Sequence, residues 1–365
     1  MAHLITFLGK GGVGRTTVAI AAAKKLAQNG DRVLLATQDP TPAFSVQLGV
    51  PVTPDPTEIA PNLSVVQFQS PVMLEKGWEE VKSLEAQYLR SPTLKNVYGQ
   101  ELAVFPGIET ALSFYEIRNF NASFKYDVII YDGAGDLSTL KGFGIPGSAN
   151  WYLRRFRQVI LESDLGKALA PFVQPITNAI FNRSWSLENF AEEPTDEIRS
   201  LLQEGEKAIA DPKRVLAYLI TDDSPMAIAK AQYLWGSAQQ VGVSVGGVLW
   251  NKTNSPSAQS SEFSPLPIIP LPPWQGDDWQ PLMDALPNLR NVGDIPKPIE
   301  IDSPSRQVKV FLPGFSKQQV KLTQYGPELT IEAGDQRRNL ILPPPFTGQP
   351  VKGAKFQKPY LIISL

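Results

Sequence analysis

Residues 9–17 of the chain form a glycine-rich stretch, Gly-Lys-Gly-Gly-Val-Gly-Arg-Thr-Thr, whose residue types and spacing suit phosphate binding. Glycines permit backbone conformations that side chains exclude, so several N–H groups can point at one anion, and a following helix adds the positive end of its dipole. The spacing fits G-x-x-x-x-G-K-[ST], with arginine in place of the lysine. We therefore predict a phosphate cradle formed by Gly9, Lys10, Gly11, Gly12, Val13, Gly14, Arg15, Thr16 and Thr17, in which the Thr16 hydroxyl binds Mg²⁺.

The elements on either side of this stretch support the cradle. An apolar run ends at Gly9 and a run of helix formers follows from Thr17 to Ala27, so we predict a strand, a tight loop and a helix. The alternative is a glycine-rich turn that binds nothing. Arg15 weakens the case for catalysis more than for binding, because a guanidinium keeps the charge but is a bulky planar fork.

Composition limits the other possible functions. The 365 residues carry a net charge of −2 and no polybasic run, so neither nucleic acid nor a membrane surface is an expected partner. The chain has no cysteine, which excludes disulfides, thiolate metal sites and cysteine nucleophiles. The single histidine, His3, opens the first strand, where we expect an edge or surface position. No apolar run approaches about 18 residues, so we expect no integral membrane segment and a cytoplasmic protein.

Strand and helix patterns alternate along residues 1–295, which predicts an α/β fold of the P-loop type, with a mostly parallel sheet flanked by helices and a helical section. The expected strands after the first are Arg32–Thr37, Leu63–Phe68, Asp127–Asp132, Arg214–Thr221, Val245–Trp250 and Pro267–Pro270. The expected helices are Val72–Phe114, interrupted at Pro106–Glu109, then Met226–Gln240 and Asp277–Asn288.

Two polar residues follow buried strands at the edge where α/β sheets bind their ligands. Asp132 ends an apolar run, where its carboxylate could hold Mg²⁺, directly or through water, opposite Thr16. Asn251 ends a later strand, where its amide could bind an adenine edge or simply cap a loop.

The rest of the chain divides into a helical section and a β-rich tail. We assign helical sections to about 68–120 and 151–210; the apolar face of 151–210 is either a surface for a hydrophobic protein client or ordinary core packing. From residue 296 to residue 365, short period-two strands separated by turn signals predict a small all-β sandwich. These alternating pairs are Val308 and Val310, Val320 and Leu322, Leu329 and Ile331, Leu340 and Leu342, and Leu361 and Ile363.

Several motifs together carry a family resemblance. GKGGVGRTT resembles the deviant P-loop GKGGVGKTT of dimeric ATPases, and Asp39-Pro40, Pro106-Gly107-Ile108-Glu109 and Asn251 are similar to motifs of the arsenical-pump and tail-anchored-protein targeting ATPases. This resemblance covers about residues 1 to 290. The tail from about 305, with Leu312-Pro313-Gly314-Phe315, is similar to the α-crystallin domain of small heat-shock proteins.

The resemblance implies an ATP- and Mg²⁺-dependent homodimer. It places a catalytic Lys10 that reaches the partner's nucleotide, a catalytic Arg15, a Mg²⁺-binding Asp132 in the second switch and an adenine-binding Asn251. The chain departs from the family where Arg15 replaces the lysine and Val46 replaces the carboxylate that orients the attacking water. Asp136 is considered as a substitute for this water-orienting carboxylate. The family's interfacial and arsenite-binding cysteines are missing, which argues against metalloid pumping.

Three hypotheses follow. The first is a nucleotide-gated dimeric ATPase that acts on a hydrophobic client, with hydrolysis slowed by Arg15 and Val46. The second is a pseudo-ATPase that binds nucleotide and serves as a chaperone-like binding module. The third, a DNA- or membrane-positioning ATPase, is disfavoured by the neutral charge and the β-rich tail. The tail itself could be a client-binding domain or a packing module.

Overall fold

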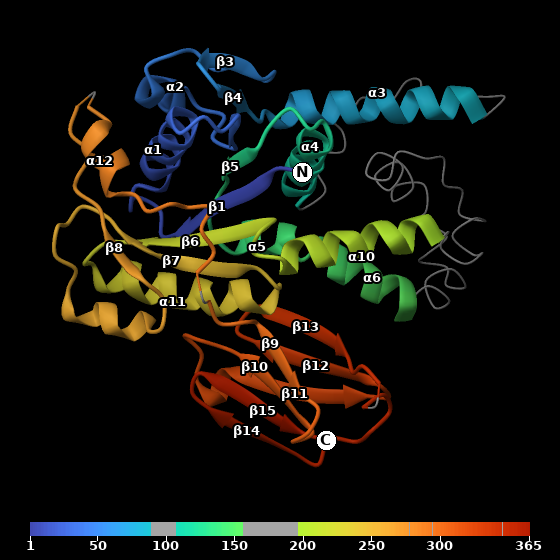
Figure 1. Cartoon of the computed structure of the whole chain (residues 1–365). Helices are drawn as coiled ribbons and strands as arrows, with labels where there is room; N and C mark the ends of the chain where they lie inside the picture. The colour runs from blue at the N-terminus through green and yellow to red at the C-terminus, as the bar shows by residue number, and fades with distance from the viewer. Residues whose placement is uncertain (89–106, 156–195, 277, 294, 345) are drawn as a thin grey trace.

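The computed structural model describes residues 1–88, 107–155, 196–276, 278–293, 295–344 and 346–365. It contains a large α/β part and a C-terminal β-sandwich (Figure 1). This confirms the fold class predicted from the sequence.

The α/β part is organised around a sheet of eight described strands in the order β3-β4-β2-β5-β1-β6-β7-β8. All neighbouring pairs are parallel except β3 with β4. The carboxyl ends of the parallel strands therefore meet at one edge of the sheet. The strands are β1 His3–Gly9, β2 Val33–Thr37, β3 Thr57–Ala60, β4 Leu63–Gln67, β5 Val128–Asp132, β6 Val215–Thr221, β7 Ser244–Trp250 and β8 Ile268–Pro270.

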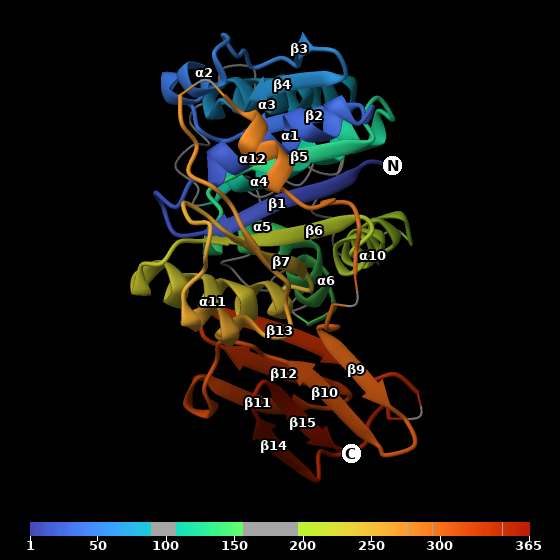
Figure 2. The same cartoon turned by 60° about the vertical axis from the view of Figure 1, so that its left-hand side comes forward.

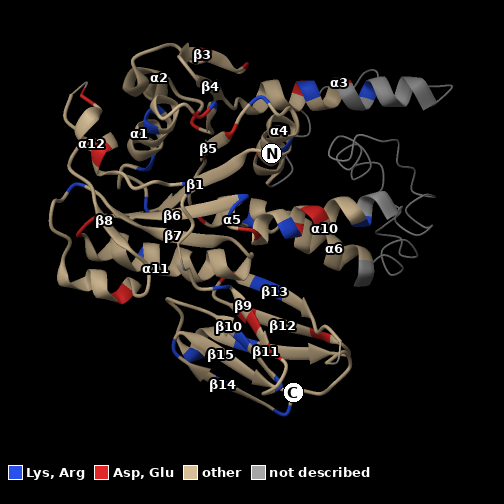
Figure 3. Ribbon diagram, in the orientation of Figure 1, with Lys and Arg blue, Asp and Glu red and all other residues tan. Residues whose placement is uncertain are grey.

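Helices cover both faces of this sheet, which is why β1 and β5 are buried along their whole length and mostly apolar. One face packs on α1 (Arg15–Gln28), α2 (Pro42–Leu48) and α12 (Gln280–Ala285). The other packs on α3 (Ser70–Tyr88), α4 (Ile108–Ala122), α5 (Leu137–Phe143) and α11 (Pro225–Gln240). The helices α6 (Ile145–Arg155) and α10 (Asp196–Ala210) pack on each other. Both signs of charge occur on α3 and α10, as expected of solvated helix faces (Figure 3).

The C-terminal sandwich has two antiparallel sheets, ordered β14-β15-β10-β9 and β11-β12-β13, around an apolar core of their own. Figures 1 and 2 both show the sandwich against α11. At this junction the Trp235 ring of α11 meets Phe311 edge-on with centroids 5.5 Å apart, and Arg338 donates to Gln239 O at 2.8 Å. The strands are β9 Ile299–Asp302, β10 Gln307–Phe311, β11 Val320–Tyr325, β12 Glu328–Ala333, β13 Gln336–Ile341, β14 Gly353–Gln357 and β15 Tyr360–Ser364.

The structure corrects some expectations. His3 is not at an edge or on the surface: β1 is a central strand, and the ring is 5% exposed with Nε2 3.1 Å from Pro212 O. The last helix of the α/β part is shorter than predicted, at Gln280–Ala285. The short strands β3, β9 and β14 were not predicted, because each lies at a sheet edge and has few buried residues to mark it.

Two predicted features extend beyond the residues that the structure describes. Residues 89–106 of the first helical section and 156–195 of the second lie outside the described ranges, so most of the proposed client surface does too. Among the described helices, none is both long and apolar enough to cross a bilayer.

Candidate functional site

The glycine-rich loop joins the end of β1 to the start of α1, as predicted. Gly14 caps the helix in a left-handed conformation with φ of 93°, and Gly12 has φ of 86°, conformations that other residues rarely adopt. A Cβ at Gly9 would overlap the carbonyl oxygen of Ile220 on β6, whereas Gly11 and Gly12 border open space. The loop is thus packed at its base and open above, which suits close approach of a phosphate to the backbone.

The loop is tied to the tip of β7. Asn251 is buried, 4% exposed, and its Nδ2 donates to Val13 O at 2.7 Å, while a Cβ at Gly14 would overlap this amide. Beside it, Lys252 Nζ donates to Gly12 O at 2.8 Å and lies 3.8 Å from Asp222 Oδ2. Sequence reasoning singled out Asn251 and missed Lys252, although both stand at the same strand tip.

Asp132 lies at the carboxyl end of β5 and is 6% exposed. Its Oδ2 accepts a hydrogen bond from Thr37 Oγ1 at 3.2 Å, and the Thr16 hydroxyl is a second partner. Burial raises the pKa of Asp132 to about 6, against the lowering effect of the Thr16 hydroxyl, the Arg15 charge and the Thr37 hydroxyl. The structure therefore brings Thr16 and Asp132 together, and the buried carboxylate lacks a full counter-charge.

These two groups fit a magnesium ion that takes its remaining ligands from phosphate and water. Mg²⁺ binds oxygen ligands and commonly uses one or two protein groups together with substrate phosphates. In the part of the chain that the structure describes, no cluster of three or more His, Asp or Glu could hold a metal alone. A cation beside Asp132 would stabilise the charged carboxylate that burial disfavours.

Arg15 points to the loop that follows β5. Its Nη1 donates to Gly133 O at 3.2 Å and to Ala134 O. Burial lowers the pKa of Arg15, opposed by the charges of Asp132 and Asp136. A Cβ at residue 135 would overlap the guanidinium, and Gly135 has φ of 62°. The glycine at this position of the loop after β5 therefore leaves room for the Arg15 side chain.

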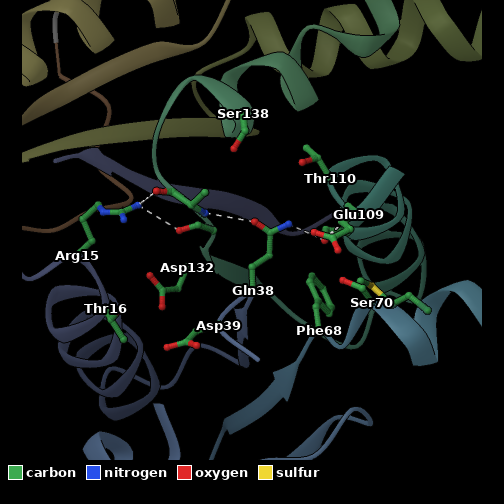
Figure 4. A pocket seen from close by; sticks show the side chains of 14 residues that line it. Arg15, Thr16, Gln38, Asp39, Phe68, Ser70, Glu109, Thr110, Asp132 and Ser138 are labelled. Atoms are coloured by element: carbon green, nitrogen blue, oxygen red, sulfur yellow. Dashed lines mark hydrogen bonds between the residues drawn. The ribbon is translucent and has the colours of Figure 1, made fainter. Parts of the chain in front are cut away.

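A cavity of about 420 Å³ opens between the phosphate loop and the start of α4 (Figure 4). Its lining residues come from the segments that follow β2, β4 and β5 and from the helices α1, α3, α4 and α5. They are Arg15, Thr16, Gln38, Asp39, Phe68, Ser70, Met73, Glu109, Thr110, Ser113, Asp132, Gly133, Ala134 and Ser138. Sequence reasoning placed Gln38 in a loop at the ligand-binding edge of the sheet without giving it a role. It missed Thr110 and Ser113, because only the fold brings α4 to the end of β2.

The other predicted site residues lie around the cradle. Lys10 is exposed, and its Nζ is 3.3 Å from Gly11 O. The Thr17 hydroxyl accepts a hydrogen bond from Gln47 Nε2 of α2 at 2.6 Å. The Val13 side chain is buried, with 2% exposed, so only the backbone of Val13 could contact a phosphate.

The two residues considered for orienting water lie elsewhere. Val46 lies on α2 with 79% of its surface exposed and is not among the cavity residues. Asp136 caps α5: its Oδ1 accepts from the backbone N of Ser138 at 2.8 Å and from its hydroxyl at 2.7 Å. Both capping bonds engage the same carboxylate oxygen, so the cap accounts for the position of Asp136.

Comparison with known proteins assigns the family. The family model for the anion-transporting ATPase matches residues 2–264, and the model for the HSP20-like domain found in ArsA matches residues 305–365. A protein named as an arsenical pump-driving ATPase from Chlorobaculum tepidum is 23% identical over 401 aligned positions, which cover 99% of this chain and 95% of that protein. ATPase GET3 of Meyerozyma guilliermondii is 32% identical over 181 positions, covering 44% of this chain and 50% of that protein. The chain therefore belongs to the anion-transporting ATPase family and ends in an HSP20-like domain.

Proposed function

We propose that this protein binds Mg-ATP in the loop of residues 9–17 and hydrolyses it slowly, as a nucleotide-gated dimer that acts on a hydrophobic protein client. The observation that carries the proposal is the convergence of the loop, Thr16 and Asp132 on one cavity. The loop amides would bind the phosphates, and Thr16 and Asp132 would hold the metal. Bound magnesium would neutralise phosphate charge.

Slow hydrolysis is supported by the two departures from the family's motifs. The Arg15 guanidinium donates to carbonyl oxygens of the 133–135 loop, so it must leave them before it can reach a phosphate. Val46 has no group that could orient water and lies outside the cavity. Since phosphoryl transfer depends on positioning and charge neutralisation, each departure should lower the rate.

Dimerisation is supported by Lys10. This side chain is exposed, and its Nζ donates to the neighbouring carbonyl oxygen of Gly11 at 3.3 Å. Its exposure supports the proposal that Lys10 reaches a nucleotide held by a second copy. Sedimentation of the protein with and without Mg-ATP tests this, and Lys10→Ala should weaken a nucleotide-dependent dimer.

A hydrophobic client is supported by the composition of residues 151–210 and by the family. Of this section, the structure describes the Trp151–Arg155 end of α6 and all of α10. Tyr152 is 53% exposed there. Suppression of the aggregation of an apolar test segment, with and without Mg-ATP, measures whether nucleotide controls binding.

Titration calorimetry with Mg-ATP, combined with phosphate release in the same sample, tests the central proposal. Thr16→Ala should weaken magnesium-dependent binding by about tenfold or more, because a metal ligand is lost. Thr57→Ala, on the exposed edge strand β3, is the matched control. Binding without turnover would favour the pseudo-ATPase alternative, and absence of binding would overturn the proposal.

A further inference from the structure

A chain of hydrogen bonds fixes the side-chain amide of Gln38, at the carboxyl end of β2. Ser113 Oγ donates to the backbone oxygen of Glu109 at 2.8 Å. With its proton used in this way, Ser113 Oγ accepts from Gln38 Nε2 at 2.7 Å. The backbone N of Ala134 donates to Gln38 Oε1 at 3.3 Å. These partners determine which end of the Gln38 amide is the nitrogen and which is the oxygen.

This arrangement points the amide oxygen of Gln38 towards the phosphate side of the cavity. In Figure 4 the Gln38 side chain bridges the space between the 133–135 loop, which holds Arg15, and α4. A carbonyl-type oxygen has two lone pairs, and the long contact with Ala134 N uses one of them. The second remains available to a water molecule in the cavity that Thr16 and Asp132 also line.

Two neighbouring carboxylates are each fixed by hydrogen bonds that one of their oxygens, Oδ1, accepts within its own segment. Asp39 Oδ1 accepts from the backbone N of Thr41 at 2.9 Å, within its own loop. Asp136 caps α5 through Ser138. Glu109 is the remaining carboxylate of the lining, and it stands at the start of α4, on the far side of the Gln38–Ser113 bond (Figure 4).

We propose that Gln38 is the residue that orients the attacking water, in place of the carboxylate that Val46 has replaced; this rests on the proposed ATPase function. The water oxygen bonds to the γ-phosphorus while the bond from that phosphorus to the β–γ bridging oxygen breaks, leaving its electron pair on ADP. The water proton goes to the released phosphate. Gln38 accepts a hydrogen bond but no proton, because a neutral amide is not a base, so we expect turnover to be slow.

Two phosphate analogues separate positioning of water from nucleotide binding. With Mg-ADP, beryllium fluoride mimics the ground state and tetrafluoroaluminate mimics the transition state that includes the attacking water. We expect Gln38→Ala to weaken tetrafluoroaluminate–ADP binding about tenfold or more in calorimetry, with beryllium fluoride–ADP changed less than about twofold. Turnover should fall about 100-fold with KM little changed. Gln38→Met, which keeps the length and loses the acceptor, should behave alike.

The controls examine neighbouring groups. Gln69→Ala removes an amide that donates to Gln67 Oε1 at 3.1 Å and does not line the cavity. This variant protein should therefore bind both analogues as the native chain does. Ser113→Ala frees the Gln38 amide to rotate, so its effect should be smaller and should disappear when Gln38 is already alanine.

Three outcomes would overturn the proposal. The first is equal loss of both analogues in Gln38→Ala, which would mean a structural or binding role. The second is selective loss in Glu109→Gln with Gln38→Ala normal, which would assign the role to the carboxylate. The third is a native chain that binds Mg-ATP without turnover. A native chain that does not bind Mg-ATP would instead refute the proposed function itself.

Discussion

Asp127 precedes β5 and Asp132 ends it, and folding shifts the pKa values of these two carboxyl groups in opposite directions. Burial raises the pKa of Asp132 from 3.8 to about 6, whereas hydrogen bonds from Arg32 lower the pKa of Asp127 to about 2. As the pH rises, Asp132 loses its proton at a lower pH in the unfolded chain than in the folded chain. The contribution of Asp132 to the free energy of unfolding is therefore highest below about pH 4 and falls as the pH rises to about 6. For Asp127, the stabilisation is present above about pH 4 and is lost as the pH falls towards 2.

The magnitude for Asp132 follows from the two pKa values. A difference of about two pH units between the unfolded and folded pKa corresponds to about 3 kcal/mol above pH 6. Asp132→Asn removes the buried charge, so the free protein should become more stable by up to about 3 kcal/mol at pH 8 and change little at pH 4. Asp127→Asn, which loses the exposed Arg32 pair at 2.8 Å, should lower stability at pH 8.

Urea unfolding at pH 4 and pH 8 measures both variants, without nucleotide and with saturating Mg-ATP. Ligand binding to the folded state adds stability that grows with concentration over Kd. Asp132→Asn should gain less from Mg-ATP than the native chain, because the proposed metal ligand is missing. A free Asp132→Asn protein that is less stable than the native chain at pH 8 would refute the reasoning, since the carboxylate would then have a counter-charge.

Three further substitutions test the loop after β5, the role of Asn251 and the junction between α11 and the sandwich. Gly135→Ala places a Cβ against Arg15 at positive φ and should destabilise the protein by about 2 kcal/mol in urea unfolding, whereas Gly30→Ala, with φ of 94° and open space, carries backbone strain alone. Asn251→Ala should weaken ATP binding more than GTP binding in calorimetry; equal changes would make it only a tether of the loop. Trp235→Ala should cost about 3 kcal/mol and increase hydrogen exchange in β10, whose Phe311 loses its ring partner.

The elements that carry the site could be predicted because each leaves a local signal. The loop of residues 9–17 is marked by its glycines, and the end of β5 is marked by an apolar run that stops at Asp132. Both signals arise from physical needs of a short segment: backbone freedom in one case and burial on both faces of a parallel sheet in the other.

The residues that were missed have no such local signal. Gln38 and Ser113 are far apart in sequence and make a hydrogen bond only because α4 packs beside the end of β2. Lys252 meets Gly12 through the order of strands in the sheet. Polar residues of these types occur in many loops, so their type alone cannot indicate a role, and the contacts depend on topology.

Arg15 and the loop of residues 133–136, which follows β5, are connected in the folded chain. In the structure, the guanidinium donates to the carbonyl oxygens of Gly133 and Ala134, and Gly135 is the residue whose missing side chain leaves room for it. Both bonds come from one nitrogen, Nη1, at the end of a side chain that is longer than that of lysine, so Arg15→Lys would test whether an ammonium group can reach the same two carbonyls. The loop leads directly into α5, whose Lys141 pairs with Asp335 of the sandwich at 3.1 Å, so the loop that holds Arg15 is continuous with an element that contacts the C-terminal domain.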